Sequence, residues 1–308
     1  MNIDYIDPLS NSWNRMKKAL FQPFDITKWF VVGFTAFLAG LLDGHGGGSG
    51  NSHGKWNHDF SDITRFPNIA WDWLMDNQGW FTLVIFGIIL LFAFIILLTW
   101  LSSRGKFMFL DNVVHDRAKV TKPWYDFRKH GNSLFLWRLI FGLICFAVII
   151  LFIVQFFIIA AQFHDDDFSA APIMTIVGLA FLAFIVFVVT AYISLFLSDF
   201  IVPIMYKNNI TATQAWHNFL PLLSKHWMSF LLYGLLVFML WIFIVIFIIL
   251  AGIFTCCLGF LLLIIPYIGS VVLLPISYTL RAFGPEFLKQ FGSDFDIFPQ
   301  SEDVIVQD

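Results

Sequence analysis

The chain has 308 residues, of which 59% are hydrophobic and only 13% are charged, and 39 are phenylalanine. A soluble domain of this length cannot bury so much apolar surface, so the composition excludes a soluble globular protein and indicates a lipid environment. The formal net charge of −3 is less informative, because in a membrane protein the distribution of Lys and Arg along the chain matters more than their total.

The apolar stretches predict an all-α membrane protein with six transmembrane helices. The best defined stretch, residues 79–101, has a tryptophan near each end, as expected of a span anchored at both membrane surfaces. The first stretch, 26–42, is the shortest and lies at the lower limit of about 17 residues for crossing a bilayer. Pro266 and Pro275 predict that the last span is kinked or interrupted. The predicted spans are residues 26–42, 79–101, 134–162, 172–198, 226–250 and 258–280.

Three polar segments with a common pattern precede the first, third and fifth spans. Each has a residue that can cap a helix, followed by an amphipathic stretch with a tryptophan: Trp13, Trp124 or Trp216. In the clearest copy, Thr211 or Thr213 is expected to cap the helix. The pattern predicts three hairpins of two spans, each preceded by an amphipathic cytoplasmic interfacial helix, with the three tryptophans as interfacial anchors. The alternative is a connector that only sets the geometry of chain re-entry.

Lys and Arg fall almost entirely on one side of the predicted membrane. Of the 18 cations, 16 lie on the side of the first polar segment, and only Lys55 and Arg65 lie opposite. Because loops rich in Lys and Arg stay in the cytoplasm, we expect a multi-pass protein with both termini cytoplasmic. Residues 1–290 are predicted to form a single membrane domain. The acidic tail, 291–308, is expected to be disordered, with a docking peptide as the alternative.

The predicted outer loop, residues 43–78, begins as a segment rich in Gly, Ser and His. Its His45, His53 and His58, with His164 from the second outer turn, could assemble a zinc or copper site. However, their spacing matches no structural zinc pattern, and a glycine-rich segment imposes no geometry on its ligands. A solvated flexible loop is the preferred interpretation, so no metal or other cofactor is predicted.

Ionisable residues are absent from the middle of every predicted span, where they would mark a functional site. Four charged residues lie near the cytoplasmic boundary instead: Asp111, Arg138, Asp199 and Arg281. They predict a structural ring of ion pairs or, as the alternative, a gate or headgroup site. The sequence also lacks a phosphate-binding loop and the HExxH and CxxC motifs, so no catalytic residue is predicted.

Three segments of the sequence resemble known proteins: LSSRGKFMFLDNVVHDRAKVTKPW, SDFIVPIMYKNNITATQAWHNFLPLLSKHW and LLPISYTLRAFGPEFLKQFG. They resemble those of uncharacterised bacterial six-span membrane proteins, which are distantly similar to the membrane domain attached to some glycerophosphodiester phosphodiesterases. The resemblance implies a location in the bacterial inner membrane and a module near lipid metabolism. It implies no catalytic residue, because the phosphodiesterase domain is not in this sequence.

Three functional hypotheses follow. The first is a non-enzymatic membrane scaffold or assembly subunit, whose basic interfacial helices hold anionic membrane lipid or a protein partner. The second is a transporter or permease-like subunit for a lipid or apolar substrate, with a path at the repeat interface. The third is an outward-facing metal-dependent enzyme. The interior without charge favours the first hypothesis; a homo-oligomer is compatible with it, and no nucleic acid is expected as a partner.

Overall fold

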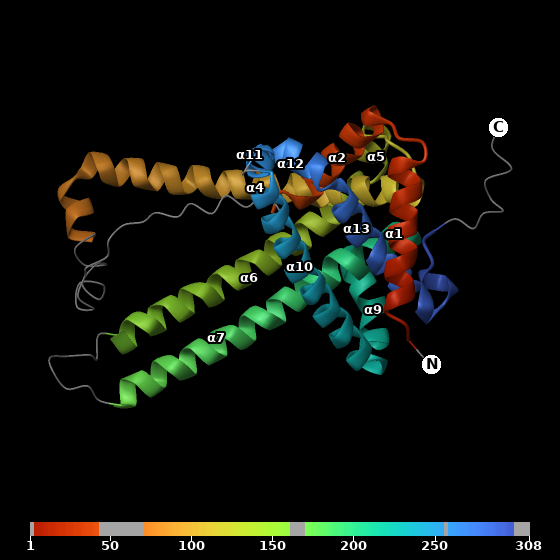
Figure 1. The fold of residues 1–308 in the computed structure, drawn as a ribbon. Helices are drawn as coiled ribbons and strands as arrows, with labels where there is room; N and C mark the ends of the chain where they lie inside the picture. The colour runs from red at the N-terminus through yellow and green to blue at the C-terminus, as the bar shows by residue number, and fades with distance from the viewer. Residues whose placement is uncertain (1–2, 43–70, 161–169, 256–257, 299–308) are drawn as a thin grey trace. The chain divides into compact units, whose positions relative to one another are not determined.

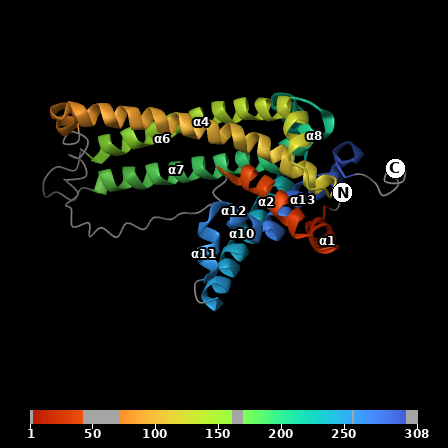
Figure 2. The same cartoon turned by 90° about the horizontal axis from the view of Figure 1, so that it is seen from above.

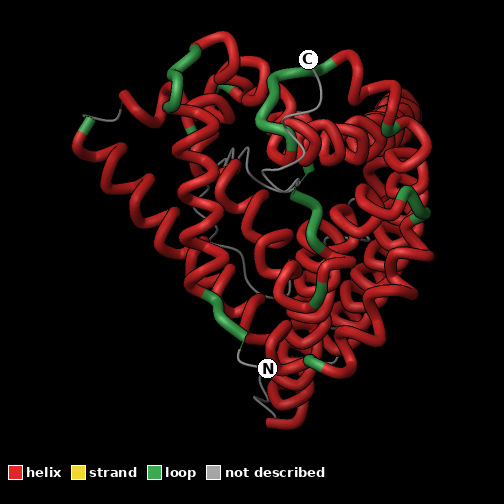
Figure 3. Tube along the Cα trace, turned by 90° about the vertical axis from the view of Figure 1, so that its right-hand side faces the viewer, coloured by secondary structure: helices red, strands yellow, loops and turns green. Residues whose placement is uncertain are grey.

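Helices joined by short turns make up the described chain, in which there is no β-strand (Figures 1 and 3). The structure is a computed structural model that describes residues 3–42, 71–160, 170–255 and 258–298. The chain divides into two compact units. Unit 1 comprises Met1–Gly48, Leu98–Arg138 and Tyr192–Asp308, and unit 2 comprises Ser49–Leu97 and Leu139–Ala191.

The helices fall into long apolar ones and shorter ones that connect or cap them. In chain order they are α1 (Ile6–Phe21), α2 (Ile26–Gly40), α4 (Gln78–Val114), α5 (Thr121–Asp126), α6 (Arg128–Ala160), α7 (Ala170–Phe196), the π-helix η1 (Leu197–Ile201), α8 (Val202–Asn208), α9 (Ala212–Lys225), α10 (Trp227–Phe254), α11 (Leu258–Ile264), α12 (Pro266–Val272), α13 (Leu274–Leu288) and the 3₁₀ turns η2 (Lys289–Phe291) and η3 (Ser293–Phe295).

Four of these segments are long and apolar enough to cross a membrane: Gln78–Val114, Arg128–Ile159, Met174–Asn208 and Trp227–Phe254. Few or none of the residues in their most apolar stretches are buried in the described structure, and the side chains of α4 from Leu83 to Leu97 are all exposed. Such long exposed apolar surfaces are stable only when lipid covers them. The chain is therefore an all-helical membrane protein.

The first and last predicted spans differ from the others. Helix α2 has 15 residues and is about 22 Å long, which is shorter than the roughly 30 Å of a bilayer core. The last predicted span is broken into α11, α12 and α13, with a bend of 69° between α12 and α13. Pro266 and Pro275 stand at the starts of α12 and α13, as the sequence indicated, since proline cannot continue the preceding turn. The described chain thus has four to five candidate spans, and six crossings stay a prediction.

Helix α4 continues well beyond residue 101, the predicted end of the second span. Its side chains from Ser102 to Val114 are all buried, including Arg104, Lys106 and Asp111. The sequence pattern missed this continuation because charged residues at the end of an apolar run normally indicate a solvated loop. Here the charges are enclosed because other helices of unit 1 supply polar partners for them.

In unit 1, α1 and α13 lie side by side (Figures 1 and 2). The backbone N–H of Asp4 donates to Oε1 of Gln290 at 2.9 Å, and Nε2 of Gln290 donates back to the carbonyl of Asp4 at 2.8 Å. Tyr5 stacks on Phe287 with ring centroids 5.5 Å apart. Backbone N–H groups of Ile6 and Asp7 bind the Asp4 carboxylate and hold its pKa below its usual value. The beginning and end of the described chain are therefore packed together.

The centre of unit 1 is an aromatic core. Phe200 of the π-helix lies 4.9 Å from Tyr233 and 5.2 Å from Phe230 of α10, measured between ring centroids. Phe287 of α13 lies 4.7 Å from Tyr233. The π-helix that presents Phe200 precedes Pro203, which has no N–H to continue the regular α-helical hydrogen bonds.

Unit 2 contains the exposed apolar parts of α4, α6 and α7. A contact between α4 and α6 is the edge-to-face pair of Phe92 and Phe146, whose centroids are 5.6 Å apart. Most other large side chains of these stretches are exposed, in contrast to the enclosed side chains of unit 1. Such an exposed apolar surface is typical of helices that contact lipid.

The beginning of the tail is packed rather than disordered. Ile297 and Phe298 are buried, and the guanidinium of Arg15 lies 3.6 Å from the centroid of the Phe298 ring. The expectation of disorder over 291–308 therefore fails for 291–298. The remaining residues, 299–308, lie outside the described part.

Candidate functional site

Unit 1 holds a set of buried polar and charged side chains, most of them on α4 and α13. They are Ser12, Thr35, Thr99, Ser102, Ser103, Arg104, Lys106, Asp111, Asn112, Thr279, Arg281 and Glu286. Buried charge is costly unless it is paired or hydrogen-bonded, so the partners of these residues show what the site can do.

Arg281 connects α13 to α4 and to the π-helix. Its Nη2 donates to the backbone carbonyl of Lys106 at 2.8 Å, and its Nη1 donates to the carbonyl of Ser198 at 3.0 Å. Nζ of Lys106 donates to Oγ of Ser198 at 3.1 Å. The neighbouring Asp199 accepts a hydrogen bond from the hydroxyl of Tyr233 at 2.9 Å. This group of side chains joins α4, α10, α13 and the π-helix.

Asp111 is the centre of a second group on α4. Arg117 binds its carboxylate with both Nε, at 3.0 Å, and Nη2, at 2.6 and 2.7 Å. The hydroxyl of Tyr206 on α8 donates to Oδ1 at 2.9 Å, and Nδ1 of His115 lies 3.4 Å from the same atom. Asn112, the next residue, donates from Nδ2 to Oγ1 of Thr35 on α2. The last turn of α4 is thereby fixed to α8 and α2.

Three of the four predicted boundary charges lie on α4 or contact it. Arg138 of α6 donates to Oγ of Ser102, Arg281 reaches the carbonyl of Lys106, and Asp111 follows near the end of α4. Arg281 also donates to the carbonyl of Ser198, the residue before Asp199. The ring of ion pairs, and its alternative of a gate or headgroup site, stay predictions.

Three functional candidates were missed by the sequence prediction: Arg104, Arg117 and Tyr206. The sequence prediction counted Arg104 and Arg117 only among the cations between the second and third spans, on the cytoplasmic side. The uninterrupted sequence from Ser102 to Val114, which has no proline and a single glycine, was a signal that the helix continues.

The three predicted tryptophan anchors have different surroundings. Trp13 on α1 is 47% exposed. Trp124 on α5 packs edge-on against Trp100, with centroids 5.7 Å apart, and Trp216 on α9 stacks on Trp137 at 5.6 Å. Two of the three therefore pack against a tryptophan of a long helix, and their depth in a membrane stays a prediction.

Helix α9 begins as the sequence indicated. Thr211 is its N-cap, and the backbone N–H of Thr211 donates to Oε1 of Gln214 at 3.0 Å. Phe219 on this helix is fully buried, whereas the next residue, Leu220, is exposed.

The candidate metal ligands His45, His53, His58 and His164 all lie outside the described residues. Within the described ranges, no group of three or more His, Cys, Asp or Glu side chains could hold a metal ion. The metal site is consequently untested.

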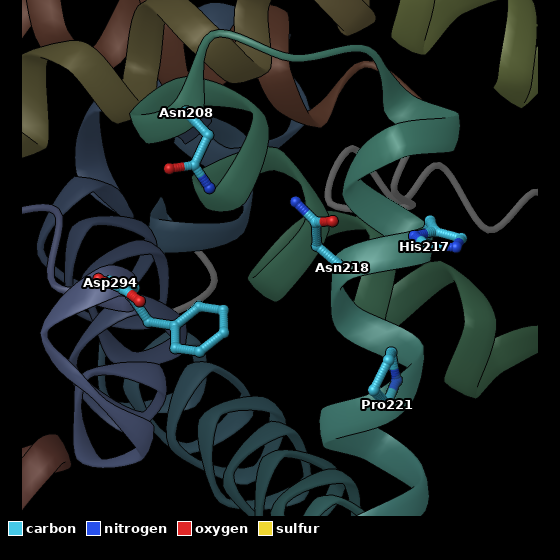
Figure 4. Close-up of a pocket in the computed structure, with 6 residues that line it drawn as sticks. Asn208, His217, Asn218, Pro221 and Asp294 are labelled. Atoms are coloured by element: carbon cyan, nitrogen blue, oxygen red, sulfur yellow. The ribbon is translucent and has the colours of Figure 1, made fainter.

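A hollow of about 510 Å³ lies beside α9 in unit 1 (Figure 4). Asn208 at the end of α8 and Asn218 on α9 point toward its space, and Asp294 approaches from η3. His217, Pro221 and Phe295 complete the lining. The hollow has one carboxylate and no cation in its lining, so it offers weak hydrogen bonding and no arrangement typical of catalysis.

Comparison with known proteins gives a family but no activity. A model of a family of unknown function, DUF7544, matches residues 3–287, so the chain belongs to this family. No curated protein and no solved structure matches the chain. The family match agrees with the resemblance to uncharacterised proteins, while the similarity to the membrane domain of glycerophosphodiester phosphodiesterases stays a prediction.

Proposed function

We propose that this member of the DUF7544 family is a non-enzymatic integral membrane scaffold that engages anionic lipid through a basic cytoplasmic surface. It lies in a bacterial inner membrane with six spans and both termini in the cytoplasm. The three tryptophan-bearing helices α1, α5 and α9 lie at the membrane surface.

The observation that carries the proposal is the use of buried charges as connections between helices. Arg281 binds two backbone carbonyls on other helices, and Asp111 binds the side chains of Arg117 and Tyr206. Arg15 of α1 forms an ion pair with the buried Glu286 of α13 at 3.0 Å. Charges in a transport path or catalytic site face a water-filled space, whereas these charges contact protein groups and stabilise one arrangement of helices.

The exposed cations support the engagement of lipid. Six of them lie on α1, on or just before α5, and at the start of α6: Lys17, Lys18, Lys119, Lys122, Arg128 and Lys129. Large exposed aromatic side chains accompany them, among them Trp13, Phe21, Phe24 and Tyr125. Cations beside exposed aromatic groups are typical of surfaces that bind the anionic headgroups of a cytoplasmic leaflet.

The test is the composition of lipid that copurifies with the full chain in mild detergent. Mass spectrometry should find anionic phospholipid enriched over its fraction in the membrane from which the protein was extracted. A lipid composition equal to that of the source membrane would contradict the proposal.

A permease-like subunit is the second candidate, because of the 69° bend between α12 and α13. Broken helices expose backbone groups that can line a path for a substrate. Vesicles containing the purified chain should then move a labelled lipid between leaflets faster than empty vesicles, and equal rates would exclude this candidate. The third hypothesis, an outward-facing metal-dependent enzyme, rests on histidines outside the described residues and stays a prediction.

A further inference from the structure

Arg104 is a buried cation with an unusual environment. It lies one turn after Trp100 on α4 and is only 7% exposed. Its guanidinium carbon lies 4.3 Å from the ring centroid of Trp100 and 4.8 Å from that of Trp124. Its Nη2 donates to Oδ1 of Asn132 on α6 at 3.1 Å. Two indole rings and one amide thus surround the guanidinium.

This environment does not satisfy the donors of Arg104. A guanidinium has five N–H groups, and within the described ranges Asn132 is the one protein acceptor of this side chain. Its Nε is fully buried with no partner. No carboxylate of the described residues lies within ion-pair distance of it. Contact with aromatic rings offsets part of the cost of burying the charge. The charge still has no counter-ion, and the free N–H groups still have no acceptor.

A second cation lies next to the first. Arg128 begins α6 and precedes Gly131 and Asn132 by one helical turn, and both of these residues contact the Arg104 side chain. Arg128 is exposed, and it is close enough for its charge to repel that of Arg104. The nearby carboxylate of Asp126 is also exposed and forms no ion pair with a described residue. Two guanidinium groups at this point therefore lack an anion.

The position of the pair suggests which anion binds there. The continuously exposed apolar part of α4 ends at Leu97, one turn before Trp100, which packs against Trp124. In the proposed membrane arrangement both rings lie at the level where aromatic side chains anchor proteins to a membrane surface. Residues 98–138 contain eight Lys and Arg and three Asp, a net charge of +5 with His neutral. At this level the abundant anion is the phosphate of a phospholipid headgroup.

We propose that Arg104 and Arg128 bind the phosphate group of an anionic phospholipid, with Trp100 and Trp124 packing beside it. Arginine binds phosphate oxygens through charge-assisted hydrogen bonds, so the phosphate supplies the missing counter-charge and accepts from the free N–H groups of Nη1 and Nη2, while Nε stays buried. The site deepens the proposed scaffold function and rests on it, because it names one lipid-binding position among the exposed cations. Free inorganic phosphate shares the chemistry but lacks the acyl chains that an adjacent apolar surface would bind.

The experiment measures the affinity of delipidated full chain in detergent for three probes: short-chain phosphatidylglycerol, diacylglycerol of the same chain length, and inorganic phosphate. The variants are R128Q, which removes an exposed cation, and R104K, which keeps the charge but removes the planar pair of donors. K225Q removes an exposed cation at the end of α9 and is the matched control. Circular dichroism and thermal unfolding report whether each variant folds.

We expect phosphatidylglycerol to bind with at least about tenfold higher affinity than diacylglycerol. R128Q and R104K should each lower the affinity for phosphatidylglycerol by about tenfold, whereas K225Q should leave it unchanged. Equal affinity of folded R128Q and the unaltered chain would overturn the site. If anionic lipid was nonetheless enriched during purification, the proposed scaffold function would stand without the site at Arg104 and Arg128. Inorganic phosphate binding as tightly as the lipid, with the same dependence on both arginines, would identify a free-ion site and overturn the lipid assignment.

Discussion

The carboxylate of Asp111 shows how a single charge organises the protein. Its side chain is 1% exposed, and Arg117, which binds it through two nitrogens, is 27% exposed. The pair is more shielded from water than the ion pair of Lys289 and Asp296, in which the lysine is 50% exposed. The removal of one partner should therefore lower the free energy of unfolding much more in the Asp111–Arg117 pair than in the Lys289–Asp296 pair.

We predict that R117Q lowers the free energy of unfolding by about 3 kcal/mol, because it leaves the Asp111 carboxylate buried without its counter-charge. K289Q is the control and should change the free energy by less than about 1 kcal/mol. Denaturant unfolding in detergent measures both values. The double variant D111N/R117Q should be more stable than R117Q alone, since the stranded charge is then absent; a double variant of equal or lower stability would contradict this account.

At the scale of elements, α2 and α4 approach each other at Gly105. A Cβ atom at this position would lie 2.6 Å from the backbone N of Ala39 and 2.6 Å from the carbonyl carbon of Leu38. Backbone atoms cannot rotate away as a side chain can. The close approach also brings the Ser102 hydroxyl to the carbonyl of Ala39 at 2.9 Å. Glycine is therefore required for this contact between the short apolar helix and the buried half of α4.

G105A is expected to lower the unfolding free energy by about 1–3 kcal/mol, because the added methyl group forces the two helices apart. G87A, the same substitution on the same helix, is the control, since a Cβ there has no atom within 4 Å. It should leave stability unchanged or raise it by up to about 1 kcal/mol through higher helix propensity. Equal effects of the two variants in thermal unfolding would show that the contact contributes nothing.

At the scale of the whole molecule, hydropathy predicts the helical membrane class, because exposed apolar surface leaves a strong signal in composition. The positions of Pro266 and Pro275 also predict where the last span is broken, because proline acts on the local backbone. The extent of α4 is different: Arg104, Lys106 and Asp111 are buried against partners distant in sequence, namely Asn132, Ser198 and Tyr206. The groups along α4 depend on the same tertiary contacts, so they could not be read from the sequence pattern.

The hydrogen bonds between Asp4 and Gln290 limit the topology, because residues in direct contact lie on one side of a membrane. The number of crossings between them must then be even. The four long apolar helices give an even number, so α2 and the bent pair α12–α13 either both cross or both do not. We predict that both cross, because Lys and Arg then lie almost entirely on the cytoplasmic side.

A reporter that is active only in the cytoplasm tests this topology when it is placed at either end of the chain or in the predicted loop 43–78. We expect activity at both ends and none in the loop. Activity at all three positions would mean four crossings, with α2 and the bent pair at the cytoplasmic surface. Activity at one end alone would contradict the pairing of α1 with α13, since an odd number of crossings separates the residues that this pairing joins.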